Sequence, residues 1–169
     1  MHLVTSGLLV PSIVGVLTPA TAAKFLETYF TFSLVLYIAR GRPSLPVAEF
    51  YSAISPNVIA PGTHPHPVSK TLPPVKAPNA WFHILQTTLV HPNEHLCKLQ
   101  RALAHGAAVY GNTPAGSFKK SESFSEKDAE VLDGTLFVRI AGLSANRLGW
   151  MREGQEERGW DNGGFFKDL

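Results

Sequence analysis

The residues best suited to acid–base and anion chemistry lie on one predicted helix, Pro92 to Tyr110. At about 100° per residue, leucines form an apolar stripe along one side of this helix. Polar side chains gather in an arc of about 120° on another face. The stripe contains Leu96, Leu99 and Leu103, and the arc contains Glu94, His95, Lys98, Arg101 and His105. One helix therefore presents two imidazoles, two cations and a carboxylate together.

These side chain types can exchange protons and stabilise anions. Imidazoles titrate near neutral pH, so His95 and His105 are candidate acid–base groups. Lys98 and Arg101 could stabilise a phenolate, an enolate or an oxyanion that develops during a reaction. The alternative is a solvated helix face with an ion pair between Glu94 and Lys98, which have the favourable i, i+4 spacing.

Metal binding is not indicated by this pattern. His95 and His105 are about 15 Å apart along the helix axis, too far to share one ion. Cys97 is the only cysteine, so the chain can form neither an internal disulfide nor a multi-thiolate zinc site.

Two residues outside this helix are further candidates. Arg139 stands among apolar neighbours, and its partner is either Asp133 or Glu130 or a ligand. His2 is a polar point on an otherwise apolar N-terminal segment and would face a polar cleft if that segment is helical within a larger protein.

Common nucleotide and hydrolase motifs are absent from the sequence. Without G-x-G-x-x-G there is no fingerprint for a flavin or nicotinamide site of the Rossmann type. Gly111 and Gly116 have the spacing of a phosphate loop, but Ser117-Phe118 stand where lysine and Ser/Thr are required. Neither G-x-S-x-G nor H-E-x-x-H occurs.

Hydrophobic periodicity and capping residues predict helices throughout the chain. An apolar segment up to Leu17 is interrupted by Pro11. Helices are predicted at Pro19–Arg40, Val47–Ile54, Ala80–Val90, Pro92–Tyr110 and Asp128–Trp150. On Pro19–Arg40 the apolar stripe is Phe25, Tyr29, Phe32 and Leu36, and Thr18 and Asn79 are expected caps. No segment alternates like a strand, which predicts an all-α fold, an irregular array of several helices.

Residues 55–78 contain seven prolines, so regular structure is not expected there. Apolar residues such as Val58 and Ile59 favour a loop that wraps over a surface rather than a free linker. The tail after Arg152 contains Trp160, Phe165 and Phe166, and these aromatic residues suggest that it docks.

Composition limits the classes of partner. The chain of 169 residues is 44% hydrophobic but only 17% charged, so we expect apolar surface that meets a partner, a ligand or a further part of the protein. A net charge of +2 gives no case for binding of nucleic acid or of an anionic membrane.

The apolar run Phe30–Ala39 is too short to span a bilayer. A lone cysteine favours the cytoplasm, with secretion through the N-terminal apolar segment as the alternative.

Several stretches of the sequence resemble the fungal questin oxidase-like family. They are residues 2–6, 29–33, 37–43, 91–103, 132–143 and 160–166. The resemblance extends over nearly the whole chain, but only to the C-terminal part of that family. It implies that residues 1–169 are one helical region of a larger enzyme whose histidine-rich N-terminal half has no counterpart here.

The family resemblance implies an NADPH-dependent oxygenation of the Baeyer–Villiger type, with O2 as co-substrate, in fungal secondary metabolism. An anthraquinone-like aromatic polyketide would be the substrate. It implies acid–base roles for His95, His105 and His2, and cofactor or anion binding by Lys98, Arg101 and Arg139, with no metal. The alternatives are a non-catalytic module that binds a flat aromatic ligand, or an inert truncation product; homo-oligomerisation is left open.

Overall fold

The computed structural model describes residues 2–62, 79–119 and 126–160. Within these ranges the secondary structure is helical and no strand is present, which confirms the predicted all-α fold. The described residues divide into two compact units, those up to Leu45 and those from Pro46 to Trp160. Placement of residues 1–169 as one region of a larger enzyme stays a prediction.

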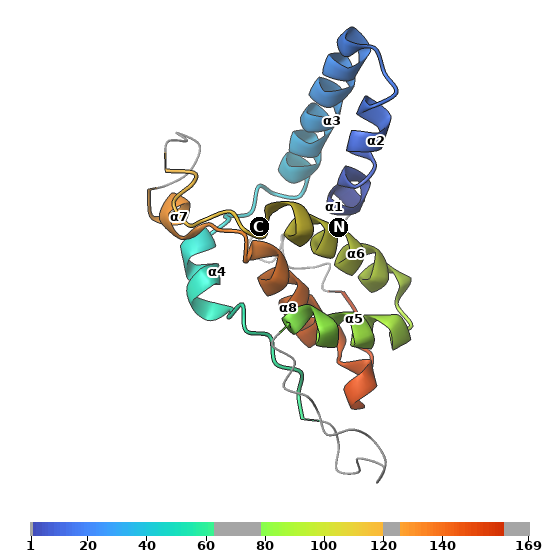
Figure 1. Ribbon diagram of the computed structural model, residues 1–169, viewed down its shortest axis with the longest axis vertical. Helices are drawn as coiled ribbons and strands as arrows, with labels where there is room; N and C mark the ends of the chain where they lie inside the picture. The colour runs from blue at the N-terminus through green and yellow to red at the C-terminus, as the bar shows by residue number, and fades with distance from the viewer. Residues whose placement is uncertain (1, 63–78, 120–125, 161–169) are drawn as a thin grey trace. The chain divides into compact units, whose positions relative to one another are not determined.

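The first unit contains α1 (His2–Gly7), α2 (Val10–Val14) and α3 (Pro19–Ala39). The chain breaks between α1 and α2 just before Pro11, as the sequence predicts. Thr18 caps α3 by accepting a hydrogen bond from the backbone N–H of Thr21. The Tyr29 hydroxyl donates to the backbone carbonyl of Leu3 at 2.8 Å and so links α3 to α1, which run side by side in Figure 1.

Most of α3 is exposed within its unit. The half-buried face includes Phe25, Tyr29 and Leu36, but Phe32 of the predicted stripe is 58% exposed. By length and composition α3 could cross a membrane, and only 6% of its apolar stretch is buried. A core helix or a signal sequence meets the same criteria, so these properties do not assign α3 to a membrane.

Helices α5 (Ala80–Val90), α6 (Glu94–Tyr110) and α8 (Leu136–Leu148) form the core of the second unit and pack against one another in Figure 1. The remaining elements of this unit are α4 (Val47–Ala53), α7 (Glu126–Val131) and the short 3-10 helix η1 (Met151–Glu153). The core cluster contains Ile84, Leu99, Leu103, Ala141, Ala145 and Trp150. Fully buried Gln100 donates to the carbonyl of Ala141 at 2.9 Å, which joins α6 to α8 through a polar contact.

The start of α6 differs from the prediction that Pro92 is its first residue. Asn93 is the cap, and its side chain accepts from the backbone N–H of His95 at 3.1 Å. The buried ring of His91 accepts from the Asn93 N–H at 3.1 Å and lies 3.2 Å from the carbonyl of Leu148. These bonds hold the ends of α5, α6 and α8 together, and they favour Asn93 over Pro92 as the boundary.

The prediction of one long helix from Asp128 to Trp150 is wrong. The chain forms two helices, α7 and α8, which are separated by residues 132–135. The Asp133 carboxylate accepts hydrogen bonds from both the backbone N–H and the hydroxyl of Thr135, at 2.8 and 2.5 Å. Such local bonds stabilise a turn in place of a continuous helix.

Residues of the predicted wrapping loop and docking tail reach the core where the structure describes them. Val58, Ala60 and Trp160 pack against the core cluster, while Ile59 is 83% exposed. The rest of the proline-rich segment, residues 63–78, and the aromatic residues Phe165 and Phe166 lie outside the described residues.

Candidate functional site

The polar arc of α6 faces away from the core of its unit. The buried positions of the helix are Leu96, Leu99, Gln100, Ala102, Leu103 and Gly106. Lys98 and Glu94 form the ion pair anticipated by the solvated-face alternative, with Nζ to Oε1 at 3.1 Å and both side chains more than half exposed. The hydrogen bond from Lys98, and then its charge, lower the pKa of Glu94.

The two predicted histidines of α6 lie about 15 Å apart along the helix axis and do not form one group. His95 is the more sheltered, with its side chain 38% exposed and Nδ1 4.0 Å from the Glu94 carboxylate. His105 and Arg101 are exposed on the same helix. His2 lies in the other unit, on α1, where it is exposed.

The Arg139 guanidinium forms hydrogen bonds to other residues of this chain. Its Nε donates to the Thr135 hydroxyl at 2.8 Å, and its Nη1 donates to the carbonyls of Tyr51 and Ile54. The guanidinium also lies over the ring of Tyr51, 4.3 Å from its centre. The partners anticipated from the sequence, Asp133 or Glu130, are therefore replaced by the carbonyls at the end of α4 and by Thr135. Arg139 closes the C-terminal end of α4, where unpaired carbonyls favour a cation.

Tyr51 extends this network to the turn before α8. Its hydroxyl donates to the backbone carbonyl of Asp133 at 2.9 Å and accepts from the N–H of the same residue at 3.1 Å. Burial, opposed in part by the backbone hydrogen bond to Asp133, raises the pKa of Tyr51 above its ordinary 10.0. The charge of Asp133 acts in the same direction as burial.

The raised pKa of Tyr51 predicts a loss of stability in alkali. The fold favours the neutral phenol, so this contribution is fully present below the unfolded pKa of about 10 and is lost as the pH rises from there through the higher pKa of the folded state. We expect the free energy of unfolding, measured by urea titration from about pH 9 to pH 11, to fall less in Tyr51→Phe than in the wild type. Tyr110→Phe, at a tyrosine that is 60% exposed, is the control and should keep the wild-type slope. Equal slopes in all three proteins would contradict the prediction.

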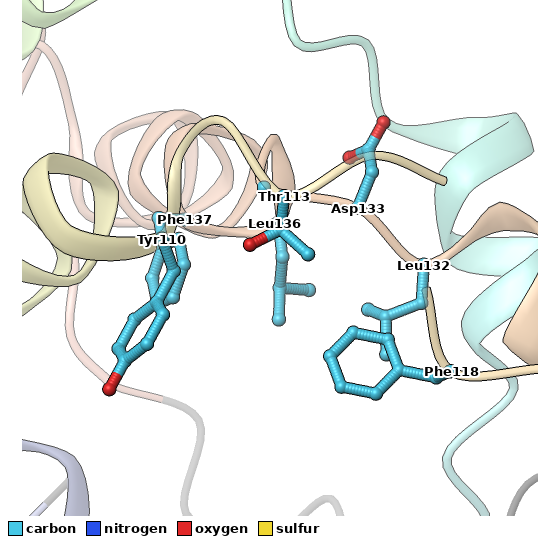
Figure 2. A pocket seen from close by; sticks show the side chains of 8 residues that line it. Tyr110, Thr113, Phe118, Leu132, Asp133, Leu136 and Phe137 are labelled. Carbon is cyan, nitrogen blue, oxygen red and sulfur yellow. The ribbon is translucent and has the colours of Figure 1, made fainter. Parts of the chain in front are cut away.

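An apolar hollow of about 270 Å³ opens where α6 ends and α8 begins. Its lining includes Tyr110, Phe118, Leu132, Leu136 and Phe137. The rings of Tyr110 and Phe137 are stacked, with centres 6.3 Å apart and planes 21° from parallel. Figure 2 shows these two rings side by side and the Asp133 carboxylate directed away from Leu132 and Phe118. The stacked rings of Tyr110 and Phe137 form an aromatic wall, against which the hollow can accept a flat apolar group.

None of the six candidate residues from the sequence lines this hollow or two further hollows, of about 650 and 280 Å³, beside Val58 and Ile59. Sequence reasoning missed the aromatic lining because Tyr110 and Phe137 are 27 positions apart and meet only through packing. The one local signal was the run of small residues at 106–108, which allows close approach to this end of α6. Among the described residues no group of three His, Cys, Asp or Glu could hold a metal ion.

The questin oxidase-like family model matches residues 1–103. This is more than half of the chain. The chain belongs to the questin oxidase-like family. For this questin oxidase-like chain, membership indicates an oxidase-type function. No curated protein and no solved structure matches it.

The family match includes some of the candidate residues and excludes others. His2, His95, Lys98 and Arg101 lie within the matched residues, whereas His105 and Arg139 lie beyond them. The resembling stretches at 132–143 and 160–166 and the whole lining of the aromatic hollow are also outside the match. Family membership and the hollow are therefore two independent observations.

Proposed function

We propose that this questin oxidase-like chain takes part in an NADPH-dependent Baeyer–Villiger-type oxidation of an anthraquinone-like aromatic polyketide. In net terms a ring ketone, O2, NADPH and a proton give a ring-expanded lactone, NADP+ and water, and addition of one water to the lactone then gives the ring-opened hydroxy acid. The family match carries the oxidase-type part of this proposal. The apolar hollow with its aromatic wall supports a flat aromatic substrate.

The distances along α6 favour His105 over His95 as the acid–base group for a substrate in the hollow. At about 1.5 Å per residue, His105 is about 7.5 Å from Tyr110 along the helix axis. His95 is about 22 Å from Tyr110 on the same scale. A proton can be transferred only within hydrogen-bond reach or through one water, so His95 is too distant from this hollow. His105 is exposed and does not line the hollow, so a substrate bound there would have to extend beyond the hollow to reach it.

NADPH, as the proposed reductant, would supply two electrons when bound. The three cations predicted to hold it differ in what they contact. Arg139 is directed to the end of α4, while Lys98 and Arg101 lie exposed on α6 and Lys98 is paired with Glu94. Of these three, Lys98 and Arg101 are exposed to solvent, where a phosphate would compete with Glu94 for Lys98, and we assign no step of the reaction to them.

The proposal is tested by following NADPH absorbance with anthraquinone-2-sulfonate or a related hydroxyanthraquinone under air. We expect NADPH and O2 to be consumed only when the anthraquinone is present, and mass spectrometry to detect an oxygenated product. Boiled protein and substrate-free reactions serve as controls. If NADPH is consumed without incorporation of oxygen from labelled O2, the Baeyer–Villiger assignment is wrong.

A binding module for flat aromatic ligands is the second candidate function, and the same hollow favours it. Quenching of tryptophan fluorescence by the anthraquinone without consumption of NADPH would support this alternative. The chain has three tryptophans for this measurement, Trp81, Trp150 and Trp160. Absence of both quenching and turnover would contradict both candidates.

A further inference from the structure

The position of the Phe137 ring depends on a glycine of the facing helix. Gly106 is buried on α6. A Cβ placed on it would lie 2.6 Å from Cδ1 and 3.1 Å from Cζ of Phe137. Carbon atoms pack at about 3.5–4.0 Å, so the ring occupies the space that any other residue type at position 106 would fill.

The aromatic wall follows from this close contact. Phe137 lies against the backbone of α6 at Gly106, and Tyr110, one turn further along α6, stacks on the same ring. Both rings line the hollow. A side chain at position 106 would push Phe137 outward and thereby change the width of the hollow and the stacking of Tyr110.

We propose that Gly106 is a positioning residue that sets the aromatic wall and thereby selects flat aromatic ligands for the hollow. This inference rests on the proposed function for its ligand class. The claim that Gly106 positions the Phe137 ring depends only on the contact between these two residues and not on the ligand.

A matched control exists on the opposite helix. Gly142 of α8 is buried like Gly106, and a Cβ on it would lie 2.9 Å from Cγ1 and 3.2 Å from Cβ of Val58. Val58 lines the two hollows of about 650 and 280 Å³ but not the aromatic one. Gly142→Ala therefore creates a similar collision at a helical glycine while leaving the aromatic wall untouched.

The experiment compares Gly106→Ala with Gly142→Ala in the full chain. We expect Gly106→Ala to weaken binding of anthraquinone-2-sulfonate about tenfold by fluorescence quenching, and to remove the nuclear Overhauser contacts between the Tyr110 and Phe137 rings. Gly142→Ala should bind within about twofold of wild type and keep those ring contacts. Equal loss of affinity in the two variants, or unchanged ring contacts in Gly106→Ala, would overturn the inference.

A double variant separates positioning from a general loss of structure. In a Phe137→Leu background the shorter side chain leaves room for a methyl group at position 106. Adding Gly106→Ala to Phe137→Leu should then change affinity by less than about twofold. A further tenfold loss in that background would contradict the proposal. If wild-type protein binds no anthraquinone, the proposed function fails, while the ring contacts still decide the role of Gly106.

Discussion

Replacing His105 with glutamine is expected to lower turnover of an anthraquinone by about 10² or more while leaving ligand affinity near the wild-type value. Glutamine keeps a polar side chain of similar length but cannot exchange a proton near neutral pH. His105 is chosen because it is the nearer of the two α6 histidines, about 7.5 Å along the axis from Tyr110, and a substrate that extends out of the hollow would meet it first. The measurement is kcat from NADPH consumption, with affinity from fluorescence quenching.

His95→Gln is the comparison for this prediction, because it makes the same change on the same helix about 22 Å from Tyr110. We expect it to keep most of the wild-type turnover. The opposite result, with loss only in His95→Gln, would move the reaction to the N-terminal end of α6, inside the residues that the family model matches. Normal turnover in both variants would exclude α6 histidines as acid–base groups.

Removing the guanidinium of Arg139 is expected to lower the free energy of unfolding by about 2–3 kcal/mol. Arg139→Met keeps most of the apolar stem but leaves the carbonyls of Tyr51 and Ile54 without their donor. It also removes the cation from the face of the Tyr51 ring. Arg139→Lys should recover only part of this loss, because an ammonium cannot reproduce the forked geometry of a guanidinium.

Urea unfolding followed by circular dichroism measures this effect. Arg101→Met is the control, since Arg101 is exposed on α6 and a surface substitution changes stability by about 0.5 kcal/mol or less. An effect of Arg139→Met no larger than that of Arg101→Met would contradict the structural role of Arg139. A rise in the KM for NADPH without loss of stability would instead support the role that family resemblance implies for it.

Local sequence signals were sufficient for most helix boundaries in this chain. Thr18 before Pro19 and Asn79 before Ala80 are side-chain caps, which act within one helical turn and can be recognised from neighbouring residues alone. The same reasoning failed between α7 and α8. There the turn at Asp133 is stabilised by Tyr51, a residue 82 positions away, as well as by Thr135.

Sequence alone determined the all-α class, the family resemblance and the polar arc of α6, because helical period and capping are local properties of the chain. Only the tertiary structure decided what those residues face. In the folded protein the polar arc faces away from the core, and Arg139 donates hydrogen bonds to carbonyls at the end of α4. The rings of Tyr110 and Phe137 stack, and Phe137 lies against Gly106. These outcomes depend on how α4, α6 and α8 pack, and contacts between residues far apart in the sequence leave no periodic signal in it.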